Sequence, residues 1–180
     1  ITEAFLDPKV KAVFTIIGGF NSNQLLPYLD YDVIAANPKI LCGFSDITAL
    51  LDAIYAKTGL VTFMGPHLSS LGMLKGCDYT LGNMVKMLMI SGENAVEPSA
   101  AWSDDLWFLD QEKREFIKND GYWELSGGTA EGTLLGGNLG TFNLLLGTSY
   151  RPAFEADTVL MVEDTSGSDI ADFMRNLTAL

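Results

Sequence analysis

A serine at the junction between an expected strand and an expected helix is the residue of this 180-residue chain best placed to do chemistry. Residues 40–42 are apolar and predict a buried strand, and a helical pattern runs from about residue 46 to residue 57. Ser45 lies between them, where a sharp turn would raise its hydroxyl above the sheet edge and place the next amides at a helix N-terminus. That geometry suits a serine nucleophile. Gly43 leaves room for the turn, although Ile47 stands where the second glycine of a G-x-S-x-G pattern would be.

The ordinary alternative for Ser45 is a helix cap. Serine or aspartate before an apolar helical run is a common N-cap, and both Ser45 and Asp46 stand at that place. Local sequence alone favours the cap over the nucleophile. A catalytic interpretation therefore needs partners from elsewhere in the chain.

Two carboxylates follow a second expected strand. Residues 158–162 predict a buried strand, and Glu163 and Asp164 come directly after it. Ligands of α/β sheets bind beyond the carboxyl ends of strands, so a carboxylate here could orient a catalytic base. The alternative is a solvated acidic loop, or acids that precede a last helix capped by Ser168 or Asp169.

A pair of glycines ends the first expected strand. Residues 10–17 form a near-continuous apolar run and predict a buried parallel strand, which Gly18 and Gly19 follow. A glycine at this place lets a backbone N–H face a ligand oxygen. An ordinary strand-ending turn is an equal alternative.

Composition limits the classes of function. The chain is 48% hydrophobic, enough for a core, and its net charge of −12 argues against binding a nucleic-acid backbone. One histidine without a C-x-x-C motif argues against a zinc site, and no apolar run is long enough to cross a membrane. The two cysteines suggest a reducing compartment, so we expect a cytoplasmic protein without a disulfide framework.

Alternating strands and helices in the first half predict an α/β fold with a parallel sheet covered by helices. We divide the chain into an N-terminal α/β domain at residues 1–90, an interdomain loop or linker at residues 91–122, and the start of a C-terminal domain at residues 123–180.

Sulfur-containing and aromatic side chains mark the middle of the chain. A helix is expected at residues 78–90, and its methionines are expected to fill a core. These are Met84, Met87 and Met89. Trp102 and Trp107, in the polar linker, could stack on a planar ligand group, but packing against their own domain is the favoured interpretation.

The order of several motifs along nearly the whole chain resembles one family. The motifs are Gly18-Gly19-Phe20-Asn21-Ser22, Asn37-Pro38-Lys39-Ile40, Gly43-Phe44-Ser45-Asp46, Thr48-Ala49-Leu50, Gly65-Pro66, Gly136-Gly137-Asn138-Leu139 and Val162-Glu163-Asp164. Together they resemble the LD-carboxypeptidase family of serine peptidases, and within it the branch of the microcin C self-immunity protein. The resemblance implies a flavodoxin-like or Rossmann-like parallel-sheet domain with a nucleophile elbow, followed by part of a second α/β domain of the swivelling β/β/α type.

The resemblance also implies a Ser-Glu-His triad that cleaves an amide bond next to a free carboxylate. Ser45 matches the family's nucleophile, and Glu163 matches its glutamate. The oxyanion hole would be formed by the backbone amides of Asp46 and Gly19, with Gly18 as the alternative to Gly19. No metal or organic cofactor is implied, and a homodimer is expected.

The third member of the triad has no match in this chain. The family's histidine lies well downstream of the glutamate, whereas His67 lies in first-domain sequence and is not assigned the role. The chain therefore looks truncated at both ends. We expect the histidine beyond Leu180, and further residues, including the first strand of the sheet, before Ile1. The 180-residue segment alone is expected to be inactive.

Residues around the glycine pair bear on the substrate. Murein-cleaving members resemble Arg-Gly-Gly-Tyr-Gly there, whereas Asn21 and its neighbours resemble the immunity branch, which acts on aminoacyl or peptidyl nucleotide conjugates. Gly18 and Asn21 are therefore expected to contact substrate. In that branch an aromatic residue of the interdomain loop stacks on the base; Trp107 is expected at that position, and the alternative is Leu109, which has no ring to stack. The expected substrate is a small peptide or a peptidyl nucleotide. A murein tetrapeptide LD-carboxypeptidase is the second hypothesis, and a non-catalytic α/β ligand-binding module is the third.

Overall fold

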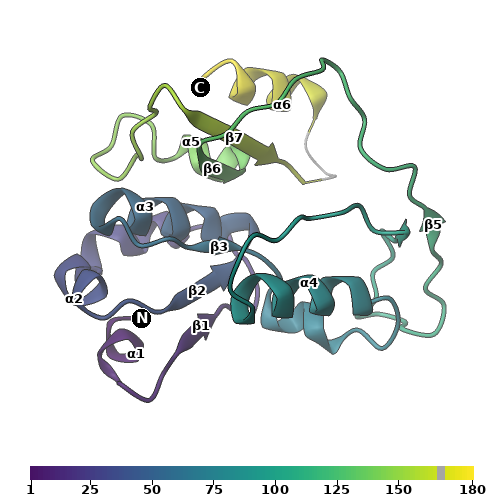
Figure 1. The fold of residues 1–180 in the computed structure, drawn as a ribbon, viewed down its shortest axis with the longest axis horizontal. Helices are drawn as coiled ribbons and strands as arrows, with labels where there is room; N and C mark the ends of the chain where they lie inside the picture. Colours follow the sequence, from purple (N-terminus) through teal and green to yellow (C-terminus); the bar gives the residue numbers. More distant parts are fainter. Residues whose placement is uncertain (166–168) are drawn as a thin grey trace. The chain divides into compact units, whose positions relative to one another are not determined.

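The computed structural model describes residues 1–165 and 169–180 (Figure 1). The chain forms two compact units: the first combines residues 1–67 with residues 130–180, and the second comprises residues 68–129. Parallel strands alternate with helices in the first unit, which confirms the mixed α/β class. The domain boundaries placed at residues 90 and 123 stay a prediction.

A parallel sheet of three short strands lies at the centre of the first unit. Its order is β1-β2-β3, and its strands are β1 (Ala12–Phe14), β2 (Ile40–Gly43) and β3 (Phe63–Met64). The first strand is shorter than residues 10–17, because its pairing with β2 ends at Phe14 and Cys42. Ile16 and Ile17, which the sequence pattern places in a buried strand, are 71% and 68% exposed.

Helices join and cover these strands. They are α1 (Thr2–Leu6), the 3₁₀ helix η1 (Ser22–Tyr28), α2 (Tyr31–Ala36), the 3₁₀ turn η2 (Ser45–Ile47) and α3 (Thr48–Thr58). The helix predicted from residue 46 is therefore confirmed, with its first turn wound as 3₁₀. It ends at Gly59, whose φ of 71° allows the left-handed C-cap conformation. The buried face of α3 packs with Phe5, Ile34 and Leu41 in the core of the unit.

A second pair of parallel strands completes the first unit. These strands are β6 (Thr133–Asn138) and β7 (Thr158–Glu163), and the helices beside them are α5 (Leu139–Asn143) and α6 (Ile170–Leu177). The strand predicted at residues 158–162 is confirmed as β7, but Leu160 and Met161 are exposed rather than buried. No predicted element corresponds to β6, because Gly136 and Gly137 interrupt its apolar pattern.

The last helix begins with a capping aspartate. The Asp169 side chain accepts a hydrogen bond from the Ala171 N–H at 3.0 Å, so this residue is the N-cap of α6. Ser168, the other candidate cap, lies outside the described residues.

Helix α3 links the two sheets of the first unit. It contacts β2 and β3 as well as β6 and α5, and Figure 1 shows it between the two groups of strands. Two of its side chains bond to the β6 backbone. The Thr48 hydroxyl accepts from the Asn138 N–H at 3.0 Å, and the Asp52 carboxylate accepts from the Gly136 N–H at 3.4 Å. The helix that follows Ser45 therefore holds the strand that lies beside β7.

The second unit contains less regular structure. Its elements are η3 (Leu68–Gly72), α4 (Asp78–Met89) and an antiparallel pair, β4 (Ala101–Trp102) with β5 (Ile117–Lys118). Helix α4 confirms the helix predicted at residues 78–90, but none of its residues is buried. Met87 and Met89 are exposed, so the expectation that the methionines fill a core is wrong. The second unit has only short strands and loops that could cover these methionine side chains.

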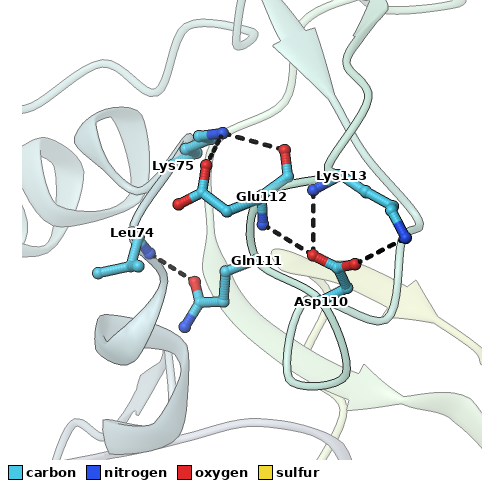
Figure 2. Close-up of polar contacts among 6 residues, drawn as sticks. All are labelled: Leu74, Lys75, Asp110, Gln111, Glu112 and Lys113. Carbon is cyan, nitrogen blue, oxygen red and sulfur yellow. Dashed lines mark hydrogen bonds and ion pairs between the residues drawn. The ribbon is translucent and has the colours of Figure 1, made fainter.

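In the second unit the side chain of Gln111 holds the backbone of residues 72–74, and charged side chains on either side of it form ion pairs. Gln111 accepts from the Leu74 N–H at 2.7 Å and donates to the Gly72 carbonyl at 3.0 Å. Lys75 forms an ion pair with Glu112, and Asp110 binds Lys113, as Figure 2 shows. The exposed ion pairs add little stability, so the two Gln111 bonds, which satisfy backbone groups, are the more useful contacts.

At 12 residues, α4 is the longest described helix, and it is too short to span a bilayer.

Candidate active site

The backbone at Ser45 has the strained conformation of a nucleophile elbow. Its φ of 59° makes Ser45 the only non-glycine residue with a positive φ in the described parts of the chain. Such a conformation is unfavourable for an L-residue and is concentrated at functional sites. The preceding residue, Phe44, is extended, so the chain turns sharply between β2 and η2.

Neither Ser45 nor Asp46 caps the helix that follows. The N-cap of η2 is Phe44 and that of α3 is Ile47, and neither helix start has a side-chain cap bond. The cap interpretation, which local sequence favoured, is therefore wrong. Within the described residues the Ser45 hydroxyl forms no hydrogen bond, and it lines a pocket of about 810 Å³.

Close packing around the elbow requires glycine at residue 43 and leaves little room for a side chain at residue 18. A Cβ on Gly43 would lie 2.4 Å from Thr15 Oγ1 and 2.9 Å from Ile47 Cγ2, which confirms that Gly43 leaves room for the turn. A Cβ on Gly18 would lie 3.2 Å from Ser45 Oγ. The glycine pair after β1 is thus folded directly against the serine.

Asp46 anchors the loop that contains the glycine pair. Its carboxylate accepts a hydrogen bond from the Ser22 N–H at 2.9 Å, and its backbone carbonyl accepts one from the Ser22 hydroxyl. Gly19 lies so close that a Cβ there would be 3.0 Å from Asp46 Oδ2. The backbone N–H groups of Gly19 and Asp46 donate no hydrogen bond among the described residues, so both are available to a ligand oxygen.

Glu163 is the last residue of β7 and lies opposite Asn138 of β6. Burial raises the pKa of its carboxyl; the Asn138 side chain lowers that pKa, and the Asp164 charge raises it. Its Oε1 atom is buried and has no partner in the described parts of the chain. Glu163 therefore has a shielded acceptor available to a further donor.

Asn138 connects the two halves of the site, a role that local sequence did not indicate. Its backbone N–H donates to Thr48, and its side-chain oxygen accepts from the N–H and the hydroxyl of Thr141 at 3.1 and 2.9 Å. An asparagine at a strand-to-helix junction is an N-cap signal, and this one caps α5. Its contact with Thr48 depends on tertiary structure, which local patterns do not contain.

The pocket beside Ser45 contains several of the expected site residues. Gly19, Asn21, Ser45 and Asp46 line it, and Asp164, the neighbour of Glu163, lies on its wall. Gly18 lines an adjoining pocket of about 470 Å³. The cationic side chain at the larger pocket, Arg175, forms an ion pair with Asp172 at 2.7 Å. No three His, Cys, Asp or Glu side chains form a metal-binding group in the described part of the chain.

Trp107 belongs to the second unit, and its proposed contact with substrate stays a prediction. Its ring lies 3.8 Å from where a Cβ on Gly72 would be and meets the Phe108 ring edge-on at 6.0 Å. The side chain is half-buried within its own unit. Leu109, its alternative, is 72% exposed.

The chain matches two models of one family, described as the LD-carboxypeptidase N-terminal domain, at residues 1–65, and the LD-carboxypeptidase C-terminal domain, at residues 131–180. A relative named "Putative carboxypeptidase YocD", from Bacillus subtilis, is 56% identical over 98% of this chain and 54% of its own length. The microcin C7 self-immunity protein MccF of Escherichia coli is 40% identical, over 92% of this chain and 50% of its own length. The chain thus spans about half the length of these relatives.

Solved structures resemble the chain over the same extent. An MccF-like protein from Bacillus anthracis has a TM-score of 0.96 and 52% identity, covering 99% of this chain and 55% of that one. MccF in complex with glutamyl sulfamoyl guanosine has a TM-score of 0.89 and 36% identity, covering 98% of this chain and 55% of that one.

Proposed function

The chain belongs to the LD-carboxypeptidase family, and on that basis we propose that Ser45 is the nucleophile of a hydrolase that cleaves an amide bond next to a free carboxylate. The observation that carries the proposal is the φ of 59° at Ser45, next to the unbonded amides of Gly19 and Asp46. A helix-capping serine has no need of that strain, whereas a nucleophile at an elbow does.

The reaction is an acyl transfer through an ester on Ser45. The Ser45 hydroxyl oxygen attacks the carbonyl carbon, and its proton passes to a histidine. The negative charge that develops on the carbonyl oxygen is stabilised by the amides of Asp46 and Gly19, with Gly18 as the alternative. The C–N bond then breaks, the amine leaves with the proton from the histidine, and water hydrolyses the ester.

Glu163 is proposed to orient that histidine and to stabilise its charged form. Its buried and unpartnered Oε1 is a suitable acceptor for an imidazole N–H. The histidine itself is proposed to come from outside residues 1–180, because His67 hydrogen-bonds to the backbone of Phe44 and not to Ser45. Glu163→Gln should therefore lower kcat strongly.

The proposed substrate is an aminoacyl or peptidyl nucleotide conjugate. Its support is the similarity to MccF, which has been solved with glutamyl sulfamoyl guanosine, and the Asn21 loop that lines the pocket with Ser45. Asn21 is proposed to contact the substrate, and Trp107 to stack on the base. The cytoplasmic location, the homodimer and the inactivity of the isolated segment remain predictions.

The substrate proposal is tested with the full-length protein on two compounds, glutamyl sulfamoyl adenosine and a murein tetrapeptide, with Ser45→Ala as the matched control. We expect release of glutamate from the conjugate and its loss in the control. Faster cleavage of the tetrapeptide would instead identify a murein carboxypeptidase. Tight binding of a compound without turnover would favour a non-catalytic binding module.

A further inference from the structure

His67 is almost fully buried beside the elbow, although no catalytic role was assigned to it. The side chain follows Gly65 and Pro66, directly after β3, and only 3% of it is exposed. Its Nε2 atom lies 3.2 Å from the backbone nitrogen of Phe44 and 3.0 Å from the carbonyl oxygen of Phe44. The imidazole also stacks on the Phe44 ring, with the centroids 3.9 Å apart.

The segment containing His67 continues the pairing between β2 and β3. The strand ladder ends where Gly43 pairs with Met64, and the Gly65 N–H then donates to the Gly43 carbonyl at 3.0 Å. Phe44 directly follows β2 and has no backbone partner on β3 in the described parts of the chain. The His67 side chain takes that place, so it supplies the bond that a further strand residue would supply.

One backbone group of Phe44 depends on His67 alone. The Phe44 carbonyl already accepts a hydrogen bond from the Ile47 N–H at 3.2 Å. The Phe44 N–H has no other acceptor in the described parts of the chain. A neutral imidazole with Nε2 unprotonated satisfies this group, and leaving it unsatisfied in a partly buried place would be costly. Burial lowers the pKa of His67, which favours the neutral form.

We propose that His67 is a positioning residue, which holds the backbone of Phe44 extended and so maintains the strained conformation of Ser45. This inference rests on the proposed role of Ser45 as a nucleophile. The strain at Ser45 must be held by its surroundings, and His67 fixes the residue that precedes it. The imidazole also packs against Gly18, where a Cβ would be 3.4 Å from His67 Cε1 and 3.2 Å from Ser45 Oγ.

Replacing His67 by glutamine or by asparagine separates this positioning role from simple packing. In His67→Gln the amide group can reach the position of Nε2, whereas in His67→Asn it is one carbon shorter and cannot reach Phe44. With the full-length protein, we expect His67→Asn to lower kcat by ~10²-fold with KM changed less than threefold, since a small misplacement of a reacting group has an effect of that order. His67→Gln should recover kcat to within about tenfold of wild type.

Thermal unfolding of both variants and labelling of Ser45 by a fluorophosphonate accompany the kinetics. The proposal predicts that labelling slows in His67→Asn and recovers in His67→Gln. Both variants should be folded at the assay temperature, and His67→Asn should have the lower melting temperature, because its Phe44 N–H loses its acceptor. Equal kcat in both variants would overturn the proposal, whether both keep wild-type activity or both lose it. Full activity in Ser45→Ala would instead refute the nucleophile itself, so the two failures are distinguishable.

Discussion

The backbone N–H of Asn138 donates a hydrogen bond to the side-chain hydroxyl of Thr48, at 3.0 Å and in a buried place. Thr48 begins the helix that follows Ser45, and Asn138 pairs with Glu163 across the two parallel strands. One hydrogen bond therefore connects the element that carries the proposed nucleophile with the pair of strands that carries the proposed orienting carboxylate.

Replacing Thr48 by valine tests this connection. Thr48→Val keeps the shape but removes the acceptor, so the buried Asn138 N–H is left without a partner, at a cost of about 1–3 kcal/mol in the free energy of unfolding. Because the bond also sets the position of β6, kcat should fall together with stability. Thr48→Ser, which retains the hydroxyl, is the control for both, measured by urea unfolding and by kinetics. Equal stability of the valine and serine variants would contradict the connection.

Gly43→Ala should destabilise the protein by about 1–3 kcal/mol, as overpacking does. The new Cβ would lie 2.4 Å from Thr15 Oγ1, so the segment after β1 or the elbow must move. Gly82→Ala is the matched control, because Gly82 lies inside α4 with open space around the position of its Cβ. That control should be neutral or slightly stabilising, since alanine favours a helix. The comparison uses denaturant midpoints of the two variants, and a smaller loss in Gly43→Ala than in Gly82→Ala would be inconsistent with the packing described.

Asp52 should make stability depend on pH. Burial raises its pKa to about 7, a change that the hydrogen bond from Gly136 N–H partly opposes, and its Oδ2 atom has no partner within the described residues. Because the folded-state pKa lies above the unfolded value of 3.8, the folded state binds the proton more tightly. Its contribution to stability is therefore complete below about pH 4 and is lost as the pH rises through about 7.

Asp52→Asn removes this dependence. The melting temperature of Asp52→Asn minus that of the wild type should increase by several degrees from pH 5 to pH 8. This corresponds to a change on the order of 1–3 kcal/mol in the difference between their free energies of unfolding. Asp104→Asn, at an exposed side chain in the second unit, is the control and should leave the difference flat. A difference for Asp52→Asn that stays constant with pH would mean that Asp52 is already charged in the folded protein at low pH.

Local patterns predicted the elements whose hydrophobic periodicity is uninterrupted. The strand at β2, the helix at α3, the strand at β7 and the helix at α4 are all present. The strand β6 was not predicted, because two adjacent glycines hide its pattern. The burial of α4 was overestimated, because an amphipathic pattern does not reveal whether a partner surface exists.

Part of the candidate site could likewise be predicted from local sequence, and part of it could not. Ser45 and Glu163 could be located from their places at the ends of expected strands, and the glycine pair from its place after β1. The roles of Asn138, Asp52 and His67 depend on contacts between residues far apart in sequence, such as the bond between Asp52 and Gly136, 84 positions apart. Local sequence also favoured a cap at Ser45, because a capping serine and an elbow serine have the same neighbours and differ in φ.

The most direct test of the nucleophile at Ser45 is covalent trapping. The full-length protein is treated with a fluorophosphonate and digested, and the modified residue is located by mass spectrometry, in parallel with hydrolysis of glutamyl sulfamoyl adenosine. Our account predicts an adduct on Ser45, no adduct in Ser45→Ala, and a loss of kcat of ~10⁴-fold or more in that variant. An adduct on another residue, or wild-type turnover by Ser45→Ala, would contradict it.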